Sequence, residues 1–242
     1  NVTNTVILSD YNPLNYTTER IAALSWDGQE IPVSLLYKRN RVLKDGTAPL
    51  LLQVYGSYGI ALQAKFSKYD IDLADQGFVV ANAHVRGGGA LGLQWHHAGW
   101  KMNKMNTIED TISVIDHLVA KNYTSYQRVA LTGASAGGLA VAAIANLTPT
   151  KVRAVVADVP FLDCLTKLLN SSQPGVVENY VEFGDPRSNK TVYDYIQSYS
   201  PYDNIHRDVN FPHILVTTHL NDARIRAWGP VAMHADVGKH RY

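Results

Sequence analysis

The sequence contains a single cysteine, Cys164, among its 242 residues. One cysteine excludes an internal disulfide and a cysteine-rich zinc site, so the fold must depend on its hydrophobic core, in which we expect Cys164 to lie. An excess of charge is also lacking, because 22 Lys and Arg against 21 Asp and Glu give a net charge of +1. This balance disfavours a nucleic acid or an anionic membrane as partner and favours a small molecule or a peptide.

No run of apolar residues reaches the length of a membrane span, and residues 1–20 lack the charged start and apolar centre of a signal peptide. We therefore expect a cytoplasmic protein. Asn-X-Ser/Thr sequons, which accept glycans only in the secretory route, favour the alternative of secretion. They occur at Asn1, Asn15, Asn122, Asn146, Asn170 and Asn189.

The first half of the chain has the pattern of strands. Residues 20–39 form two alternating runs joined by Asp27-Gly28, which predicts an antiparallel hairpin because such a turn needs positive φ. Residues 50–59 and 78–89 are short β-rich runs that each end in glycine. Runs of this kind are typical of buried strands that open into loops at one edge of a sheet.

The second half alternates strands with helices. Isoleucines 108, 112 and 115 and Leu118 share one helical face, which predicts a helix over 107–121 with Thr107 as N-cap and Asp110 three residues later. Strands are predicted at 128–133, 153–160 and 213–222, and a helix at 136–147. The alternation predicts an α/β fold with a mostly parallel sheet, helices on both faces, antiparallel strands at the N-terminal edge and ligands at the carboxyl ends of the strands. Residues 161–212 are the least patterned and predict an insertion over the site.

The stretch Gly133-Ala134-Ser135-Ala136-Gly137 is a G-x-S-x-G motif between a predicted strand and a predicted helix. This context predicts a nucleophile elbow, in which Ser135 adopts a strained backbone and the glycines allow neighbouring backbone to pass close by. The helix N-terminus after it would favour an oxyanion. The alternative is a glycine-rich turn that only packs helix against strand.

A serine nucleophile needs a base, and the base needs an orienting carboxylate. Asp222 is the candidate acid because it follows a strand at the same sheet edge, and its alternative role is that of a turn or cap residue. Three other aspartates compete less well: Asp110 starts a helix, Asp158 lies within its strand, and Asp163 opens the irregular segment.

No histidine stands where this architecture needs the base, after one more helix and strand. The 20 residues beyond Asp222 contain a predicted helix with His234 and a tail with His240, but no further strand. The sequence therefore predicts a hydrolase domain that is incomplete at its C-terminus, with these two histidines as weak candidates for the base. His84, His96 and His97 have patterns that favour structural or substrate-facing roles.

The chain resembles the prolyl oligopeptidase family of serine peptidases (family S9), in particular its oligopeptidase B (protease II) branch. The resemblance covers nearly the whole chain and rests on ordered blocks rather than on one motif. These blocks are "YGSYG" (55–59), "RGGGALG" with "WHHAG" (86–99), "KMNTIED" (104–110), "LTGASAGG" (131–138), "YVEFGDP" (180–186), "SPYDNI" (200–205) and "PHILVTTHLNDARIRAWGP" (212–230).

The resemblance implies that residues 1–242 form an α/β-hydrolase catalytic domain without the family's N-terminal β-propeller, and that it needs no cofactor or metal. Ser135 would attack the peptide carbonyl and Asp222 would orient the base. The resemblance further implies Tyr55 and the Ala136 amide as oxyanion donors, and Arg224, Asn179 and Phe183 as substrate-binding residues.

Two positions depart from the family pattern. Ala90 stands where the family's "RGG-x-E-x-G" block has an acid. The acidic positions that make oligopeptidase B prefer Arg or Lys are Asn179 and Val181, although Glu178 and Glu182 flank them. Without two facing carboxylates, a basic substrate side chain has less to pair with.

We therefore expect a serine-type endopeptidase that cleaves short peptides through an acyl-enzyme on Ser135. Two alternatives remain open at this point. One is a catalytically silent hydrolase-fold protein that binds peptides, and the other is a hydrolase of small esters.

Overall fold

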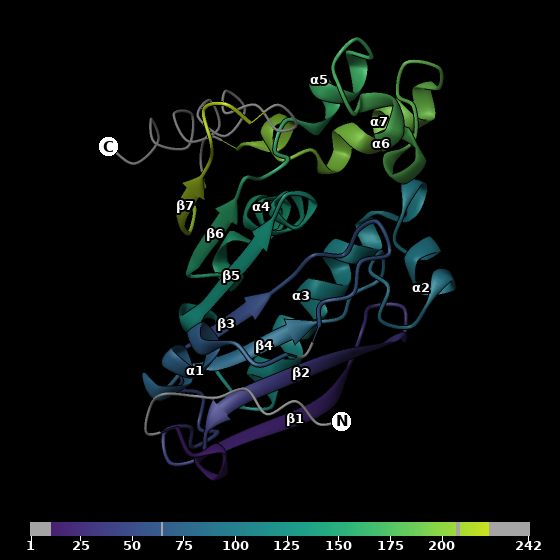
Figure 1. Ribbon diagram of the computed structural model, residues 1–242. Coiled ribbons are helices and arrows are strands. Elements are labelled where there is room, and N and C mark those ends of the chain that lie inside the picture. The colour runs from purple at the N-terminus through teal and green to yellow at the C-terminus, as the bar shows by residue number, and fades with distance from the viewer. Residues whose placement is uncertain (1–10, 64, 207–208, 223–242) are drawn as a thin grey trace.

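The structure is a computed structural model that describes residues 11–63, 65–206 and 209–222. Its centre is a seven-stranded sheet of order β1-β2-β4-β3-β5-β6-β7 (Figure 1). The strands are β1 (Tyr16–Leu24), β2 (Glu30–Lys38), β3 (Leu50–Gln53), β4 (Val79–Ala83), β5 (Val129–Ala134), β6 (Ala154–Asp158) and β7 (His213–Thr217). The helices are α1 (Lys68–Asp75), α2 (Leu93–His97), α3 (Met105–Ala120), α4 (Ala136–Leu147), α5 (Cys164–Leu169), α6 (Val176–Phe183) and α7 (Lys190–Tyr199).

The predicted hairpin is confirmed as β1 and β2, which pair antiparallel from Tyr16 opposite Lys38 to Leu24 opposite Glu30. The turn between them closes with Ser25 N donating to Gln29 O at 2.8 Å, and Gly28 has the positive φ, 84°, that the turn needs. Strand β2 also pairs antiparallel with β4. Every other pair in the sheet is parallel, so the carboxyl ends of β3, β5, β6 and β7 share one edge.

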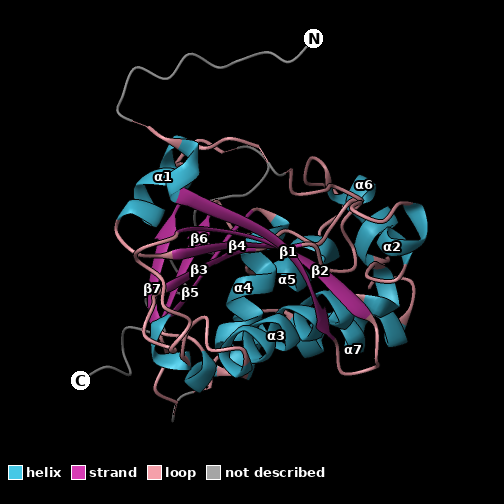
Figure 2. Cartoon of the chain, turned by 90° about the horizontal axis from the view of Figure 1, so that it is seen from below, coloured by secondary structure: helices cyan, strands magenta, loops and turns pink. Residues whose placement is uncertain are grey.

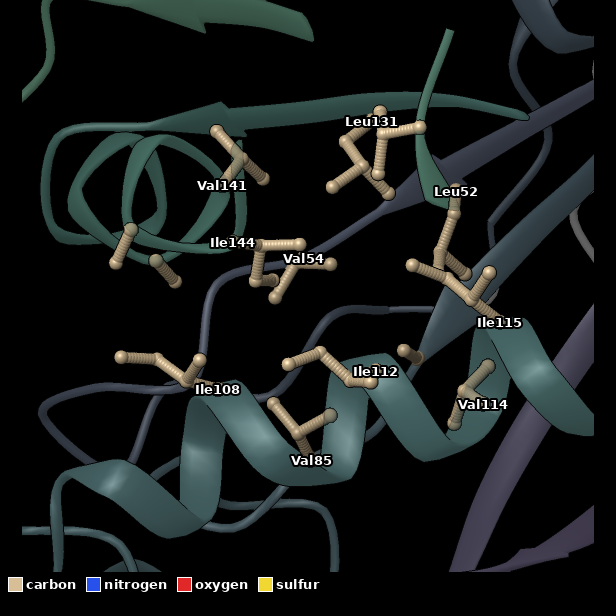
Figure 3. Packing of buried hydrophobic residues seen from close by; sticks show 14 of the residues in the cluster. Leu52, Val54, Val85, Ile108, Ile112, Val114, Ile115, Leu131, Val141 and Ile144 are labelled. Atoms are coloured by element: carbon tan, nitrogen blue, oxygen red, sulfur yellow. The ribbon is translucent and has the colours of Figure 1, made fainter. Parts of the chain in front are cut away.

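Helices cover both faces of this sheet, as the alternating pattern predicts. Helix α1 lies on one face, and α3 and α4 lie on the other (Figure 2). Figure 3 shows the core on the second face, where Ile108 and Ile112 of α3 and Ile144 of α4 meet Val54 and Val85. Cys164 is fully buried and belongs to this core, as predicted.

The predicted cap of α3 is wrong. The N-cap residue is Lys104, with no side-chain capping hydrogen bond, and the helix begins at Met105. The hydroxyl of Thr107 instead donates to Arg86 O at 2.7 Å, and Asp110 is a fully buried partner of Arg86. The side chains of Thr107 and Asp110, which the local pattern assigned to the cap, therefore make tertiary contacts instead.

The segment 161–212, which has no clear pattern in the sequence, contains three helices. Helices α5, α6 and α7 lie together beyond the carboxyl ends of β5 and β6 (Figure 1). Helix α5 is capped by Asp163, whose carboxylate accepts from Thr166 N at 3.3 Å. Helix α7 is capped by Asn189, whose side chain accepts from Thr191 N at 2.9 Å.

Candidate active site

Ser135 lies between the end of β5 and the start of α4, with φ 54° and ψ −117°. A non-glycine residue in this region costs on the order of 1–3 kcal/mol, so the surrounding structure must hold it there. Two hydrogen bonds do so: Ser135 N donates to Asp158 O at 2.9 Å, and Ser135 O accepts from Phe161 N at 3.0 Å. The strained serine of a nucleophile elbow is therefore present, as the motif predicts.

The glycines of the motif allow close backbone approaches. A Cβ on Gly133 would lie 2.3 Å from Gly137 O, and a Cβ on Gly137 would lie 2.5 Å from Val54 O. Neither approach leaves room for a side chain. The second approach also brings the start of α4 against the end of β3, which carries the next candidate residue, Tyr55.

A pocket of about 290 Å³ opens beside Ser135 and includes Tyr55 and Ala136 in its wall. Tyr55 follows β3 by two residues, and β3 is paired with β5. Ala136 is the first residue of α4, where backbone amides are not used within the helix. The fold thus brings the candidate nucleophile and both candidate oxyanion donors to one pocket.

Asp222 follows β7, the strand next to β6, and its amide donates to His219 O at 3.1 Å. It therefore stands after a strand at the same sheet edge as Ser135. The competing aspartates have other structural partners. The Asp158 carboxylate accepts from the Thr217 hydroxyl, Asp163 caps α5, and Asp110 pairs with Arg86. Asp222 stays the candidate acid because of its place after a strand at this sheet edge.

The candidate bases His234 and His240, and the candidate substrate ligand Arg224, lie outside the described residues. Three other histidines have structural contacts. The His84 ring bonds to the Ser34 hydroxyl at 2.9 Å, His96 bonds to Glu182 at 2.7 Å, and His97 stacks on Trp100. Burial, together with the charge of Arg20, lowers the pKa of His84 to about 4.

The outer wall of the pocket comes from the segment after β6. Besides the site residues, the lining includes Phe161, Lys167, Pro174, Gly175, Glu178, Asn179 and Tyr58. The Tyr58 hydroxyl donates to the Asn179 side chain at 2.9 Å, which joins α6 to the loop after β3. Burial first, and then the carboxylate of Glu182 and the phenol of Tyr55, raise the pKa of Tyr58.

Phe183 and Val181, two candidate positions on α6, do not line the pocket. Phe183 is buried and packs its ring against Phe161 and Tyr58, with ring centroids 5.6 and 6.0 Å apart. The predicted contact of Phe183 with substrate stays a prediction. Phe183 contacts the pocket through Phe161 and Tyr58, which do line it. Val181 is 63% exposed.

An ionic cluster, buried at Arg86 and Asp110 and open to solvent at Asp27, joins the hairpin turn to the segment after β4 and to α3. Arg86 donates from Nη2 to Asp110 at 2.6 Å and from Nη1 to Asp27 at 2.5 Å. This guanidinium lowers the pKa of Asp27. The sequence pattern showed Asp27 only as a turn residue, because its partner is 59 residues away.

No helix in the described part of the chain is long and apolar enough to cross a membrane. Within residues 11–63, 65–206 and 209–222, no three His, Cys, Asp or Glu side chains are grouped so that they could hold a metal ion.

The mixed sheet, the strained Ser135 and the pocket beside it define an α/β hydrolase with a nucleophile elbow. The profile of the prolyl oligopeptidase family matches residues 64–240, and the chain belongs to this family of serine peptidases.

Known proteins resemble the chain over most of its length. It is 42% identical over 221 residues to dipeptidyl aminopeptidase BI of Pseudoxanthomonas mexicana, covering 91% of this chain and 30% of that protein. It is 38% identical over 224 residues to protease 2 of Moraxella lacunata, covering 93% of this chain and 32% of that protein. Oligopeptidase B from Trypanosoma brucei with covalently bound antipain superposes with a TM-score of 0.91 at 34% identity, over 95% of this chain and 32% of that one. The chain thus spans about a third of the length of these relatives.

Proposed function

We propose that residues 1–242 belong to the hydrolase domain of a serine-type endopeptidase that cleaves peptide bonds in short peptides through an acyl-enzyme on Ser135. The observation that carries this proposal is the strained Ser135 at the wall of a pocket that also contains Tyr55 and Ala136. A turn that only packed helix against strand would not need a serine held at φ 54°. The names of the relatives, which include peptidases of several kinds, support the same reaction class.

In the proposed reaction, the Ser135 hydroxyl attacks the substrate carbonyl and the leaving amine takes a proton. The negative charge on the carbonyl oxygen is stabilised by the Tyr55 hydroxyl and the Ala136 amide, at the positively polarised start of α4. Asp222 orients a histidine base, for which His234 and His240 are the candidates in this chain. Arg224 is proposed to bind a substrate carbonyl.

The substrate side chain next to the scissile bond is proposed to enter the pocket beside Ser135. Its walls are aromatic, from Phe161 and Tyr58, with polar groups from Asn179, Glu178 and Lys167. Among the described lining residues, Glu178 is the one carboxylate, and Lys167 places a positive charge in the same wall. This mixed charge supports a weaker preference for Arg or Lys than two facing carboxylates would give.

A fluorophosphonate probe tests the nucleophile, because it reacts with an activated serine and leaves a covalent mass tag. We expect labelling at Ser135, loss of labelling in Ser135→Ala, and slower labelling in Asp222→Asn. The matched control is Asp116→Asn, which removes an acid that pairs with Lys151 and does not line the pocket, and it should keep the wild-type rate. An unlabelled wild-type chain that still binds peptides would support the silent binding protein instead. Faster turnover of a p-nitrophenyl ester than of any peptide amide would support the esterase.

A further inference from the structure

A buried ion pair of Lys104 and Glu182, with His96 bonded to the same carboxylate, forms a triad behind the pocket, and neither the motif nor the proposed reaction uses it. Lys104, at the N-cap of α3, and Glu182, on α6, are both less than 3% exposed. Lys104 Nζ lies 3.0 Å from Glu182 Oε1, and His96 Nε2 lies 2.7 Å from Glu182 Oε2. The triad therefore joins α2, α3 and α6.

The ammonium of Lys104 has an acceptor for each of its three protons. They are Glu182 Oε1, the Ser57 hydroxyl at 2.8 Å and the carbonyl oxygen of Gly56 at 3.0 Å. Burial lowers the pKa of Lys104, and the Glu182 carboxylate opposes this shift. Burying two charges is costly even when they are paired, so such a pair adds little net stability compared with apolar residues. What the pair adds is two contacts with the neighbouring loop, at Gly56 and Ser57.

The contacted loop is 55–59, which begins with Tyr55. The Thr107 hydroxyl, whose proton is directed mainly at Arg86 O at 2.7 Å, also lies 3.1 Å from the Gly56 carbonyl oxygen, so α3 contacts this carbonyl at a second point. A Cβ on Gly56 would lie 2.2 Å from Thr107 Cγ2, which shows how closely α3 supports the loop. At the other end of the loop, Gly59 packs on the His96 ring, which a Cβ on Gly59 would meet at 3.4 Å.

The same loop is held from its outer side by α6. Tyr58 has φ 55°, a left-handed conformation that is unfavourable for a tyrosine, and its hydroxyl bonds to Asn179 one helical turn before Glu182. Helix α6 thus contacts the loop through Asn179 at the pocket and, through Lys104, from behind it.

We infer that Glu182 is a positioning residue for Tyr55 and acts through Lys104. This inference rests on the proposed role of Tyr55 as oxyanion donor. A phenol on a rotatable side chain stabilises developing charge only if it is held in place before the reaction, and the ammonium holds the carbonyl of Gly56, the residue that follows Tyr55. Glu182 keeps that ammonium charged and directed at the Gly56 carbonyl. The neighbouring Glu178 and Asn179 line the pocket directly, whereas Glu182 is buried behind it.

A cycle of three variants tests this inference with the rate of fluorophosphonate labelling at Ser135. We expect Tyr55→Phe to slow labelling by about 100-fold or more, as the loss of an oxyanion donor does. Glu182→Gln keeps the size of the side chain and removes its charge, and we expect labelling about 10-fold slower. In the double variant, labelling should be less than about twofold slower than in Tyr55→Phe alone, because the effects of two residues that act through one contact are not additive. Independent, multiplying effects would overturn the inference.

A residue that only stabilised the fold would not give this coupling. The control is Glu19→Gln on β1, which removes a carboxylate bonded to Tyr37, Tyr123 and Lys44 at the other end of the sheet. It should lower stability but leave the labelling rate and the effect of Tyr55→Phe unchanged. If Glu182→Gln does not fold, Ser57→Ala, which removes one contact of the ammonium, replaces it with the same expected non-additivity and a few-fold smaller effect.

Hydrogen exchange separates this inference from the proposed function. In Glu182→Gln, the amides of residues 56–59 should exchange at least several-fold faster than in the wild type, and in Glu19→Gln they should not. A wild-type chain whose Ser135 is not labelled would refute the proposed function, and exchange would still decide whether Glu182 holds the loop. Unchanged exchange in Glu182→Gln would overturn the inference even if Ser135 is labelled.

Discussion

At the scale of single residues, the nucleophile elbow depends on the absence of a side chain at Gly133 and Gly137. Gly137→Ala would place a methyl group 2.5 Å from Val54 O and 3.1 Å from the Cα of Tyr55. Backbone cannot move aside as a flexible side chain does, so we expect a loss of stability of about 1–3 kcal/mol and much slower labelling of Ser135. The free energy of unfolding in urea and the labelling rate measure the two effects.

Gly28→Ala is the control for this substitution. Gly28 has φ 84°, and a methyl group added there would meet no atom within 4 Å, so alanine introduces backbone strain without a clash. We expect a loss of about 1 kcal/mol and an unchanged labelling rate. Equal rates for Gly137→Ala and Gly28→Ala would contradict the steric account of the elbow.

Substrate preference is also set by single residues. Asn179→Glu would add a second carboxylate to the pocket wall beside Glu178 and could still accept the Tyr58 hydroxyl. We expect kcat/KM for an Arg-amide over a Leu-amide substrate to rise by about tenfold, from the charge-assisted contact with the guanidinium. Val177→Glu is the matched control, because Val177 lies on the same helix, is exposed and does not line the pocket. A similar rise in both variants would indicate a long-range effect of charge rather than a pocket contact.

At the scale of elements, α3 carries much of the core. Ile115 and Leu118 have no exposed surface, whereas Val119 on the same helix is only partly buried. Leu118→Ala should therefore cost about 2–5 kcal/mol, through lost burial and the cavity left behind. Val119→Ala should cost under about 1 kcal/mol. Urea unfolding of both variants measures the difference, and similar midpoints would show that α3 is not anchored by this face.

Long elements with a clear period can be predicted from the sequence. Elements whose presence or bounds depend on tertiary contacts cannot. The spacing of Ile108 to Leu118 identified α3, and the alternation identified β1 and β2. The strand predicted at 213–222 is only His213–Thr217, because pairing with β6 ends at Thr217. Helices α5 and α6 have six and eight residues, which is too short for a clear period.

The same contrast between local pattern and tertiary contact applies to the residues of the candidate site. Ser135 and Asp222 could be named as candidates because the motif and the strand ends are local in sequence, whereas Tyr55 and Ala136 were named from the family resemblance. The triad of Lys104, Glu182 and His96 could not, since Lys104 and Glu182 are 78 positions apart and each has the pattern of an ordinary surface residue. Only the fold shows that the "KMNTIED" and "YVEFGDP" blocks meet behind the Tyr55 loop.

At the scale of the whole molecule, His84 links stability to pH. Its imidazole is buried at the end of β4, near the charge of Arg20, and its pKa is lowered to about 4 from an unfolded value near 6.5. Between these values the unfolded chain binds a proton that the native protein does not, so native stability falls as the pH falls through this window. The full loss attributable to His84 is on the order of 3 kcal/mol, reached near pH 4.

His84→Gln retains a group that can bond to Ser34 and removes the titration. Urea unfolding at pH 8, 6.5 and 5 should therefore show a smaller decline in the variant than in the wild type, with most of the difference appearing below pH 6.5. At pH 5 the wild type should have lost about 2 kcal/mol more than the variant, relative to pH 8. Carboxylates contribute to the pH dependence of both proteins alike, so the difference between the two curves isolates the imidazole. Parallel curves would mean that the His84 ring is protonated as readily in the native protein as in the unfolded chain.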